Sequence, residues 1–281
     1  MSDFPNDMPP YFGAPGFSDS YWFELLYDQP PRPDIDAVVR RASDEMLVQV
    51  VARGVVEDSG TVSVGYPDRL VNVGGTMLPA MTNFAWSGTR IKLGDYKSAL
   101  EQTWEWDGAR KALGRCFYKV IVGDITGSRL PYAERFRRLT TLVSACIELT
   151  KPLVCSWKEA GCLVEPARFA ERTARGCNVR LFNVGISGDS HMDTLGLAAL
   201  GLPDVELTFS KLDPGAVAAF LYRTAAYLFE RGDVIKDGDT VPGPEGLKWK
   251  TAHDAASIAP PRTVVRVTVD GLYAPISTQT N

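Results

Sequence analysis

The segment from Asp213 to Gly232 constrains the fold of this 281-residue chain more than any other feature. Asp213 is a favourable N-cap residue, Pro214 suits the first position of a helix, and Gly232 suits the left-handed residue that ends one. Between them, apolar or small side chains recur at helical spacing: Val217, Phe220, Leu221, Thr224, Ala225 and Leu228. The segment therefore predicts one long helix with a buried face. A strand at 205–209 is expected before it, entered through a turn at Pro203.

The other patterns predict an α+β protein. The expected helices are 33–43, 96–113 with a break near Gly108, 132–149, 166–172 and 214–231. The expected strands are 21–27, 46–56, 61–66, 78–86, 116–122, 153–157, 162–164, 177–186, 205–209, 248–250 and 263–269. Several strands are joined by hairpin-length links, which favours an antiparallel or mixed sheet with packed helices over a doubly wound fold.

The length fits one large domain or two lobes of similar size. Residues 1–19 are rich in Pro, Gly and Asp and predict a flexible N-terminal arm. We expect an N-terminal lobe at 20–165 and a C-terminal lobe at 166–281, because a short helix that opens at Pro166 separates the two series of elements.

Composition argues against two classes of partner. The formal net charge is -4 and the sequence pI about 5.4, whereas nucleic-acid and anionic-membrane binders need a basic surface. No apolar run is long enough to span a bilayer, and the first residues lack the pattern of a secretory signal. The five cysteines form no CxxC pair, so we expect a cytoplasmic protein without disulfides.

Few residues suggest catalysis. The chain has only two histidines, His191 and His253, and no GxSxG, GxGxxG or Walker pattern, so no catalytic residue and no cofactor is predicted. Oxygen ligands for a metal are most concentrated in one set: His191, Asp193, Asp233, Asp237 and Asp239. The competing interpretation is that Asp237 and Gly238 form a tight turn, because glycine tolerates positive φ and aspartate bonds its own backbone.

Acidic side chains near the long helix suggest a face for a basic protein partner. The candidate contact residues are Asp193, Asp204, Glu206, Asp237 and Asp239. Charge complementarity of this kind accelerates association and selects partners. Ordinary solvation and turn formation would produce the same pattern.

Several segments resemble the bacterial domain of unknown function DUF4261. They are MDTLGL (192–197), GLPD (201–204), LDP (212–214) and GDVIKDGDT (232–240), followed by Trp249 and PPR (260–262). The close resemblance covers about 178–271, and the upstream region agrees mainly in its order of elements. Proteins of this kind occur near polymorphic-toxin and type VI secretion genes, often as suspected immunity proteins.

Three hypotheses follow. The leading one is a cytoplasmic immunity protein, not an enzyme, that neutralises a cognate toxin or type VI secretion effector by occluding it. The second is an enzyme of unknown reaction with a metal or carboxylate site built from the His191–Asp239 set, which requires those groups to converge in one pocket. The third is a structural component of a secretion assembly.

Overall fold

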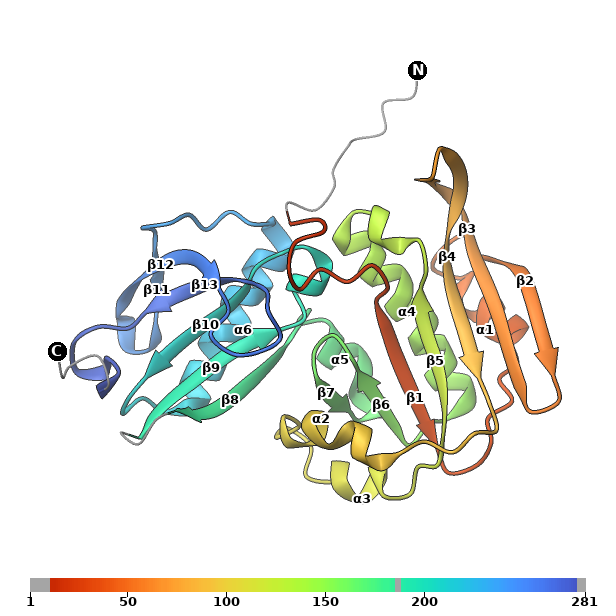
Figure 1. Cartoon of the computed structure of the whole chain (residues 1–281), viewed down its shortest axis with the longest axis horizontal. Helices are drawn as coiled ribbons and strands as arrows, with labels where there is room; N and C mark the ends of the chain where they lie inside the picture. The colour runs from red at the N-terminus through yellow and green to blue at the C-terminus, as the bar shows by residue number, and fades with distance from the viewer. Residues whose placement is uncertain (1–10, 185–187, 277–281) are drawn as a thin grey trace. The chain divides into compact units, whose positions relative to one another are not determined.

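A computed structural model describes residues 11–184 and 188–276 (Figure 1). The chain divides into two compact units. Among the described residues, unit 1 comprises 19–174, and unit 2 comprises 11–18 together with 175–276. The predicted α+β class is confirmed, because unit 1 has an antiparallel sheet, unit 2 has a mixed sheet, and helices pack on both.

The sheet of unit 1 has seven strands in the order β2-β3-β4-β5-β1-β6-β7. Every neighbouring pair is antiparallel. The strands are β1 (Trp22–Tyr27), β2 (Gln49–Val56), β3 (Ser59–Val73), β4 (Thr76–Trp86), β5 (Tyr118–Asp124), β6 (Val154–Trp157) and β7 (Cys162–Val164). Strand β1 lies between β5 and β6, so the first strand of the chain pairs with strands that come about 100 residues later.

One face of this sheet carries the main core of unit 1. Helix α4 (Tyr132–Thr150) contacts β1, β5 and α1 (Ile35–Ala42), while α5 (Phe169–Thr173) contacts α4. The aromatic centre stacks Phe136 on Trp157 at 5.9 Å between ring centroids, and the Trp157 Nε1 donates to the Tyr21 hydroxyl at 2.7 Å. Such pairs add a preferred geometry to the burial of apolar area.

The opposite face of the unit 1 sheet is only partly covered. A second cluster joins Leu26, Val154 and Leu163 of the strands to Tyr96 and Leu113. The covering helices are α2 (Lys97–Glu101) and α3 (Ala109–Leu113), and they contact β7 and β6 respectively. The helix predicted at 96–113 is therefore two short helices, since the chain leaves helical geometry between Gln102 and Gly108.

The sheet of unit 2 has six strands in the order β11-β12-β13-β10-β9-β8. They are β8 (Asn178–Val184), β9 (Asp189–Leu195), β10 (Asp204–Phe209), β11 (Thr240–Pro242), β12 (Lys248–Ala255) and β13 (Thr263–Thr268). The β10–β13 pair is parallel and the other pairs are antiparallel. The expected strand at 248–250 is longer than predicted and has a neighbour on each side.

Helix α6 (Pro214–Arg231) is the predicted long helix, and Asp213 caps it as predicted; Gly232 has the predicted positive φ, but its ψ of -171° lies outside the left-handed helical region. The Asp213 side chain accepts a hydrogen bond from the Ala216 N–H at 2.8 Å, and Gly232 ends the helix with φ 79°. The predicted face is buried, including Phe220, which packs edge-on against Trp249 of β12 at 5.4 Å. The helix contacts β8, β9 and β10 and so covers one face of the sheet.

The domain limits differ from those expected. The chain passes from unit 1 to unit 2 between 174 and 175, nine residues after the expected boundary at 165/166. Of the expected N-terminal arm, residues 1–10 lie outside the described residues. Residues 11–18 pack on unit 2, where the Tyr11 hydroxyl donates to Asp233 Oδ2 at 2.8 Å and the Ser18 N–H donates to the Ala199 carbonyl at 3.2 Å. Within the described ranges, no helix has the length and apolar character needed to cross a membrane.

Candidate functional site

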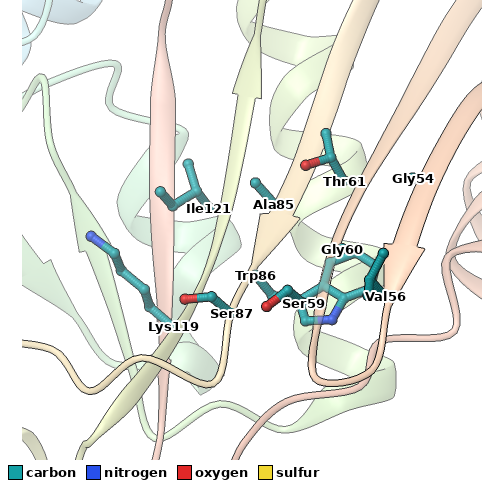
Figure 2. Close-up of a pocket in the computed structure, with 10 residues that line it drawn as sticks. All are labelled: Gly54, Val56, Ser59, Gly60, Thr61, Ala85, Trp86, Ser87, Lys119 and Ile121. Carbon is teal, nitrogen blue, oxygen red and sulfur yellow. The ribbon is translucent and has the colours of Figure 1, made fainter.

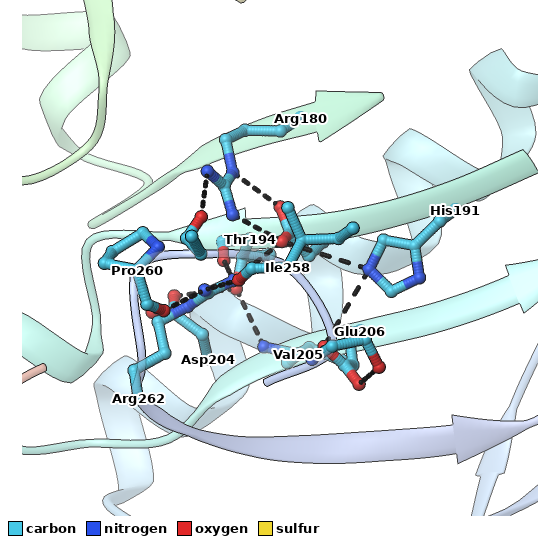
Figure 3. Close-up of polar contacts among 12 residues, drawn as sticks. Arg180, His191, Thr194, Asp204, Val205, Glu206, Ile258, Pro260 and Arg262 are labelled. Carbon is cyan, nitrogen blue, oxygen red and sulfur yellow. Dashed lines mark hydrogen bonds and ion pairs between the residues drawn. The ribbon is translucent and has the colours of Figure 1, made fainter. Parts of the chain in front are cut away.

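Charged side chains from the adjacent strands β8, β9, β10 and β13 meet on the face of the unit 2 sheet opposite α6. Figure 3 shows Arg180 of β8, His191 of β9 and Glu206 of β10 on this face, together with Arg262. Register places Asp193 of β9 directly beside Glu206 of β10, and places Arg180 of β8 beside Asp193. Register also places Arg266 of β13 beside Glu206. Two carboxylates on directly opposed residues repel each other, so the flanking arginines are what makes this arrangement stable. We call this set, together with Asp204 and Arg262, the charged network.

Each outer arginine binds the carboxylate next to it. Arg180 forms a two-pronged pair with Asp193, at 2.8 Å from Nε to Oδ1 and 2.6 Å from Nη2 to Oδ2. The Arg266 Nε donates to Glu206 Oε1 at 2.9 Å. The planar guanidinium fork suits such bidentate pairing, which fixes both distance and orientation.

Arg262 connects the charged network to the loop that covers it. Its Nη2 donates to Asp193 Oδ2 at 2.7 Å, and its Nη1 donates to the carbonyls of Ile258 and Pro260 at 2.8 and 2.9 Å. Its Nε lies 3.2 Å from Asp204 Oδ2, close enough for ion pairing but poorly aligned for a hydrogen bond. Loop 256–262 is thereby held over the carboxylates (Figure 3).

Asp204 has a structural role at the end of this network. Its Oδ1 accepts hydrogen bonds from the Thr194 hydroxyl at 2.8 Å and the Leu197 N–H at 3.2 Å, so it ties the turn after β9 to the start of β10. Burial raises the pKa of Asp204, and the nearby Arg262 guanidinium opposes that rise. Removing Arg262 would therefore leave this carboxylate with a larger cost of ionisation.

His191 lies beside the two central carboxylates without a hydrogen bond to either. Its Nδ1 is 3.0 Å from the Thr208 hydroxyl, while its Nε2 is 3.8 Å from Glu206 Oε2 and 4.0 Å from Asp193 Oδ2. Burial lowers the pKa of His191 and outweighs the two carboxylates, which act in the opposite direction. Only 2% of the residue is exposed, so its imidazole cannot reach a group in solvent.

A second cluster lies around His253 on β12. The His253 Nδ1 is 2.8 Å from Asp237 Oδ1, and its Nε2 is 3.1 Å from Asp233 Oδ1. Burial lowers the pKa of His253, but the hydrogen bonds to Asp237 and Asp233 together raise this pKa by more than burial lowers it, so the net shift is upward. Burial and then Asp233 raise the pKa of Tyr11 to about 12. The cluster fastens segment 233–239 to the sheet.

The five candidate metal ligands are divided between these two clusters. His191 and Asp193 lie on β9, whereas Asp233 and Asp237 surround β12; β10 and β13 separate these strands, a gap of about 14 Å. Asp239 accepts from the Lys236 N–H, and Gly238 has φ 86°, as expected of a tight turn. Throughout residues 11–184 and 188–276, no three His, Cys, Asp or Glu side chains are grouped so that they would hold a metal ion.

Three of the five predicted partner contacts lie in the interior. Asp193 and Asp204 are 0% exposed and Glu206 is 1% exposed, and arginines inside unit 2 occupy all three. They therefore cannot form a docking face, because a partner could reach them only if the covering loop were displaced. Asp237 and Asp239 are exposed.

Sequence reasoning missed the cationic half of the charged network. Arg180, Arg262 and Arg266 were not selected, and no strand was expected at β9 because DSHMDTL contains few apolar residues. The available signal was alternation, since Asp189, His191 and Asp193 share one face of the strand. The arginine partners come from distant positions, such as Arg262, which is 69 residues from Asp193 and is brought to it only by the tertiary structure.

The match to known families falls on this unit. Residues 193–268 match the family model described as Domain of unknown function (DUF4261). The DUF4261 region contains Asp193, Asp204, Glu206, Arg262 and Arg266 of the charged network, and it is narrower than the resemblance at 178–271. A search of curated proteins and a search of solved structures each returned no significant match.

Unit 1 presents a different kind of surface along β2. This strand lies at one edge of the sheet, where β3 is its one neighbour among the strands that the structure describes. Its Val51, Val55 and Val56 are 42%, 54% and 73% exposed. A shallow cavity of about 310 Å³ lies at the end of this edge, lined by Gly54, Val56, Ser59, Gly60, Thr61, Ala85, Trp86, Ser87, Lys119 and Ile121 (Figure 2).

Proposed function

We propose that this chain is a binding protein that pairs the exposed edge strand β2 with a strand of a protein partner, and that the partner is a toxin inactivated by occlusion. The carrying observation is the edge itself, which combines free main-chain pairing groups with three exposed valines. In this proposal the protein acts in the bacterial cytoplasm, as the resemblance to DUF4261 implies.

The chemistry of β2 supports strand addition. A strand at a sheet edge has a row of N–H and C=O groups available to another chain, and proteins usually block such edges with lysine, proline or a short strand. The eight residues of β2 include no lysine or proline, and its single charge, Arg53, is paired with Asp36. One bulge, between Val50 and Ala52, leaves the following residues in regular register with β3.

The cavity beside β2 supports recognition of side chains. In strand addition, main-chain hydrogen bonds supply affinity and pockets for alternate side chains supply specificity. Small side chains at Gly54, Ser59 and Thr61 leave room above the sheet, and Ile121 and Val56 offer apolar walls (Figure 2). A partner strand paired with β2 would lie beside Gly54 and Val56, the two residues of β2 that line this cavity, so the partner chain that follows this strand could fold over the cavity.

The test begins with capture of partners from source cells using the tagged, full-length chain, followed by mass spectrometry and co-expression with any captured toxin. The informative variant is Val55→Lys combined with Val56→Lys, which introduces two charges on the exposed edge. The matched control is Leu149→Lys, because Leu149 of α4 is similarly exposed, at 46%, but lies on a helix. We expect the double variant to weaken partner binding at least about tenfold and to abolish rescue of growth.

Two results would contradict the proposal. If the double variant and Leu149→Lys bind the captured partner as tightly as the original chain, then β2 is not the interface. If no stoichiometric protein partner is captured, or if the captured protein is not toxic when expressed alone, the toxin-neutralising function is wrong.

A further inference from the structure

We infer that a cavity in unit 2, between α6 and segment 234–242, binds a small amphipathic carboxylate. The cavity has a volume of about 630 Å³, within the usual range for small-molecule sites. It lies on a different unit from β2, so the inference is independent of the proposed partner surface.

The two walls of the cavity are held by separate anchors. One wall is a stripe of α6 formed by Phe220, Thr224 and Tyr227, which are spaced so that they share a helix face. The other wall is segment 234–242, and β12 holds it from behind. The Gly238 N–H donates to the Thr251 carbonyl at 2.8 Å, and the Thr251 N–H donates to the Asp239 carbonyl at 2.9 Å. The segment is thus fixed to the sheet, which leaves a gap on the side of the helix.

Burial along the walls shows which end of a ligand would enter. Phe220, Ile235 and Val241 are 1%, 6% and 9% exposed, so the inner surface is apolar. Tyr227 and Val234 are 49% and 43% exposed and lie at the mouth. A ligand that fits has an apolar body inside and a polar group facing solvent, because burying a polar group among these side chains without a partner is unfavourable.

Charge at the mouth favours an anion. Arg223 lines the cavity, is exposed, and forms no hydrogen bond or ion pair with another residue that the structure describes. The other charged side chain in the lining is Asp239, whose Oδ2 already accepts from the Lys236 N–H in its own turn. The guanidinium is therefore the available charged group, and it pairs well with a carboxylate.

Titration calorimetry with the full-length chain tests the inference using three probes of equal chain length: octanoate, octanol and octylamine. We expect octanoate to bind most tightly and octylamine most weakly. Arg223→Gln should weaken octanoate binding about five- to tenfold and leave octanol binding unchanged. The matched control is Arg110→Gln, because Arg110 is an exposed arginine on a helix of unit 1.

A second variant locates the site. Val234→Trp adds bulk at the exposed mouth, where it should not disturb folding, and it should reduce the binding of octanoate and octanol alike. The inference is wrong if octanoate does not bind, if Val234→Trp leaves its affinity unchanged, or if Arg223→Gln and Arg110→Gln have the same effect.

Discussion

Two carboxylates with buried oxygens, Asp193 of unit 2 and Glu159 of unit 1, are partnered in opposite ways, although unit 1 also has an arginine-paired acid in Asp124. In unit 2, Asp193 accepts hydrogen bonds from two guanidinium groups, those of Arg180 and Arg262. In unit 1, Glu159 in the β6–β7 turn accepts from the Trp22 N–H at 3.2 Å, and its buried Oε2 has no hydrogen-bond partner among the described residues. One carboxylate is therefore fully partnered and the other is not.

This difference shows that the available partners, and not burial alone, decide what a buried carboxylate does. Burial raises the pKa of Glu159 to about 8, and hydrogen bonds from its own N–H and from the Trp22 N–H oppose that rise more than Arg135 does. Unit 2 instead places arginines against its acids and uses them to hold a loop. A buried pair is not necessarily more stable than an apolar substitute, but breaking one is costly because the remaining charge loses its partner.

The largest expected effect comes from removing the shared cation of unit 2. Arg262→Leu leaves Asp193 and Asp204 without that guanidinium and should lower the free energy of unfolding of unit 2 by about 3–5 kcal/mol at pH 7. The loss should be smaller at pH 5, because the pKa of Asp204 is already raised and would rise further, so protonation relieves the unpaired charge. Urea unfolding at the two pH values measures the loss of unfolding free energy, and peptide-resolved hydrogen exchange shows whether β9 and β10 carry it.

Asp254→Asn is the control for that comparison. Asp254 is 51% exposed and pairs with Arg266 at the surface, so removing its charge leaves the buried pair of Arg266 with Glu206 in place and should cost at most about 1 kcal/mol. Equal losses for the two variants would show that the covered position of Arg262 has no special importance.

An intermediate effect is expected in unit 1. A carboxyl group whose pKa is raised on folding contributes stability that is fully present at pH values below its unfolded-state pKa of 4.5. This contribution is lost as the pH rises through the folded-state pKa of about 8. Glu159→Gln should therefore leave stability unchanged near pH 4 and increase it by about 1–3 kcal/mol at pH 9. Thermal unfolding followed by tryptophan fluorescence across this range checks it; a variant that is less stable at pH 9 would contradict the unpartnered state of Glu159.

The smallest effect concerns the two histidines, whose pKa values shift in opposite directions from 6.5. His253 should titrate above 6.5 and stabilise the fold at low pH, with this contribution lost as the pH rises through its folded pKa. His191 should titrate below 6.5 and favour the fold at high pH, with the loss on acidification. An NMR titration of the imidazole carbons measures both values, and Asp237→Asn should lower that of His253 alone.

The sequence predicted the local elements well wherever the signal was local. Helix α6, its caps at Asp213 and Gly232, and helix α4 follow from side-chain spacing and capping chemistry. The tight turn at Gly238 was also predicted, because its Asp-Gly pair has a strong preference of its own.

The candidate site was only half predictable. The acids Asp193, Asp204 and Glu206 were selected as exposed contacts, since charged residues are rarely buried without partners. Their arginine partners, and the loop that encloses them, come from other strands of the sheet. Sequence composition does not indicate which strands become neighbours.

What the sequence by itself determined is thus the position of α6, the capping of its ends and the α+β class, because these depend on interactions within a few residues. Only the tertiary structure decided that Asp193, Asp204 and Glu206 lie inside unit 2, since their burial depends on arginines that reach them across the sheet, as Arg180 and Arg262 reach Asp193. The same is true of β2, which is an edge because none of the described strands lies on its side away from β3.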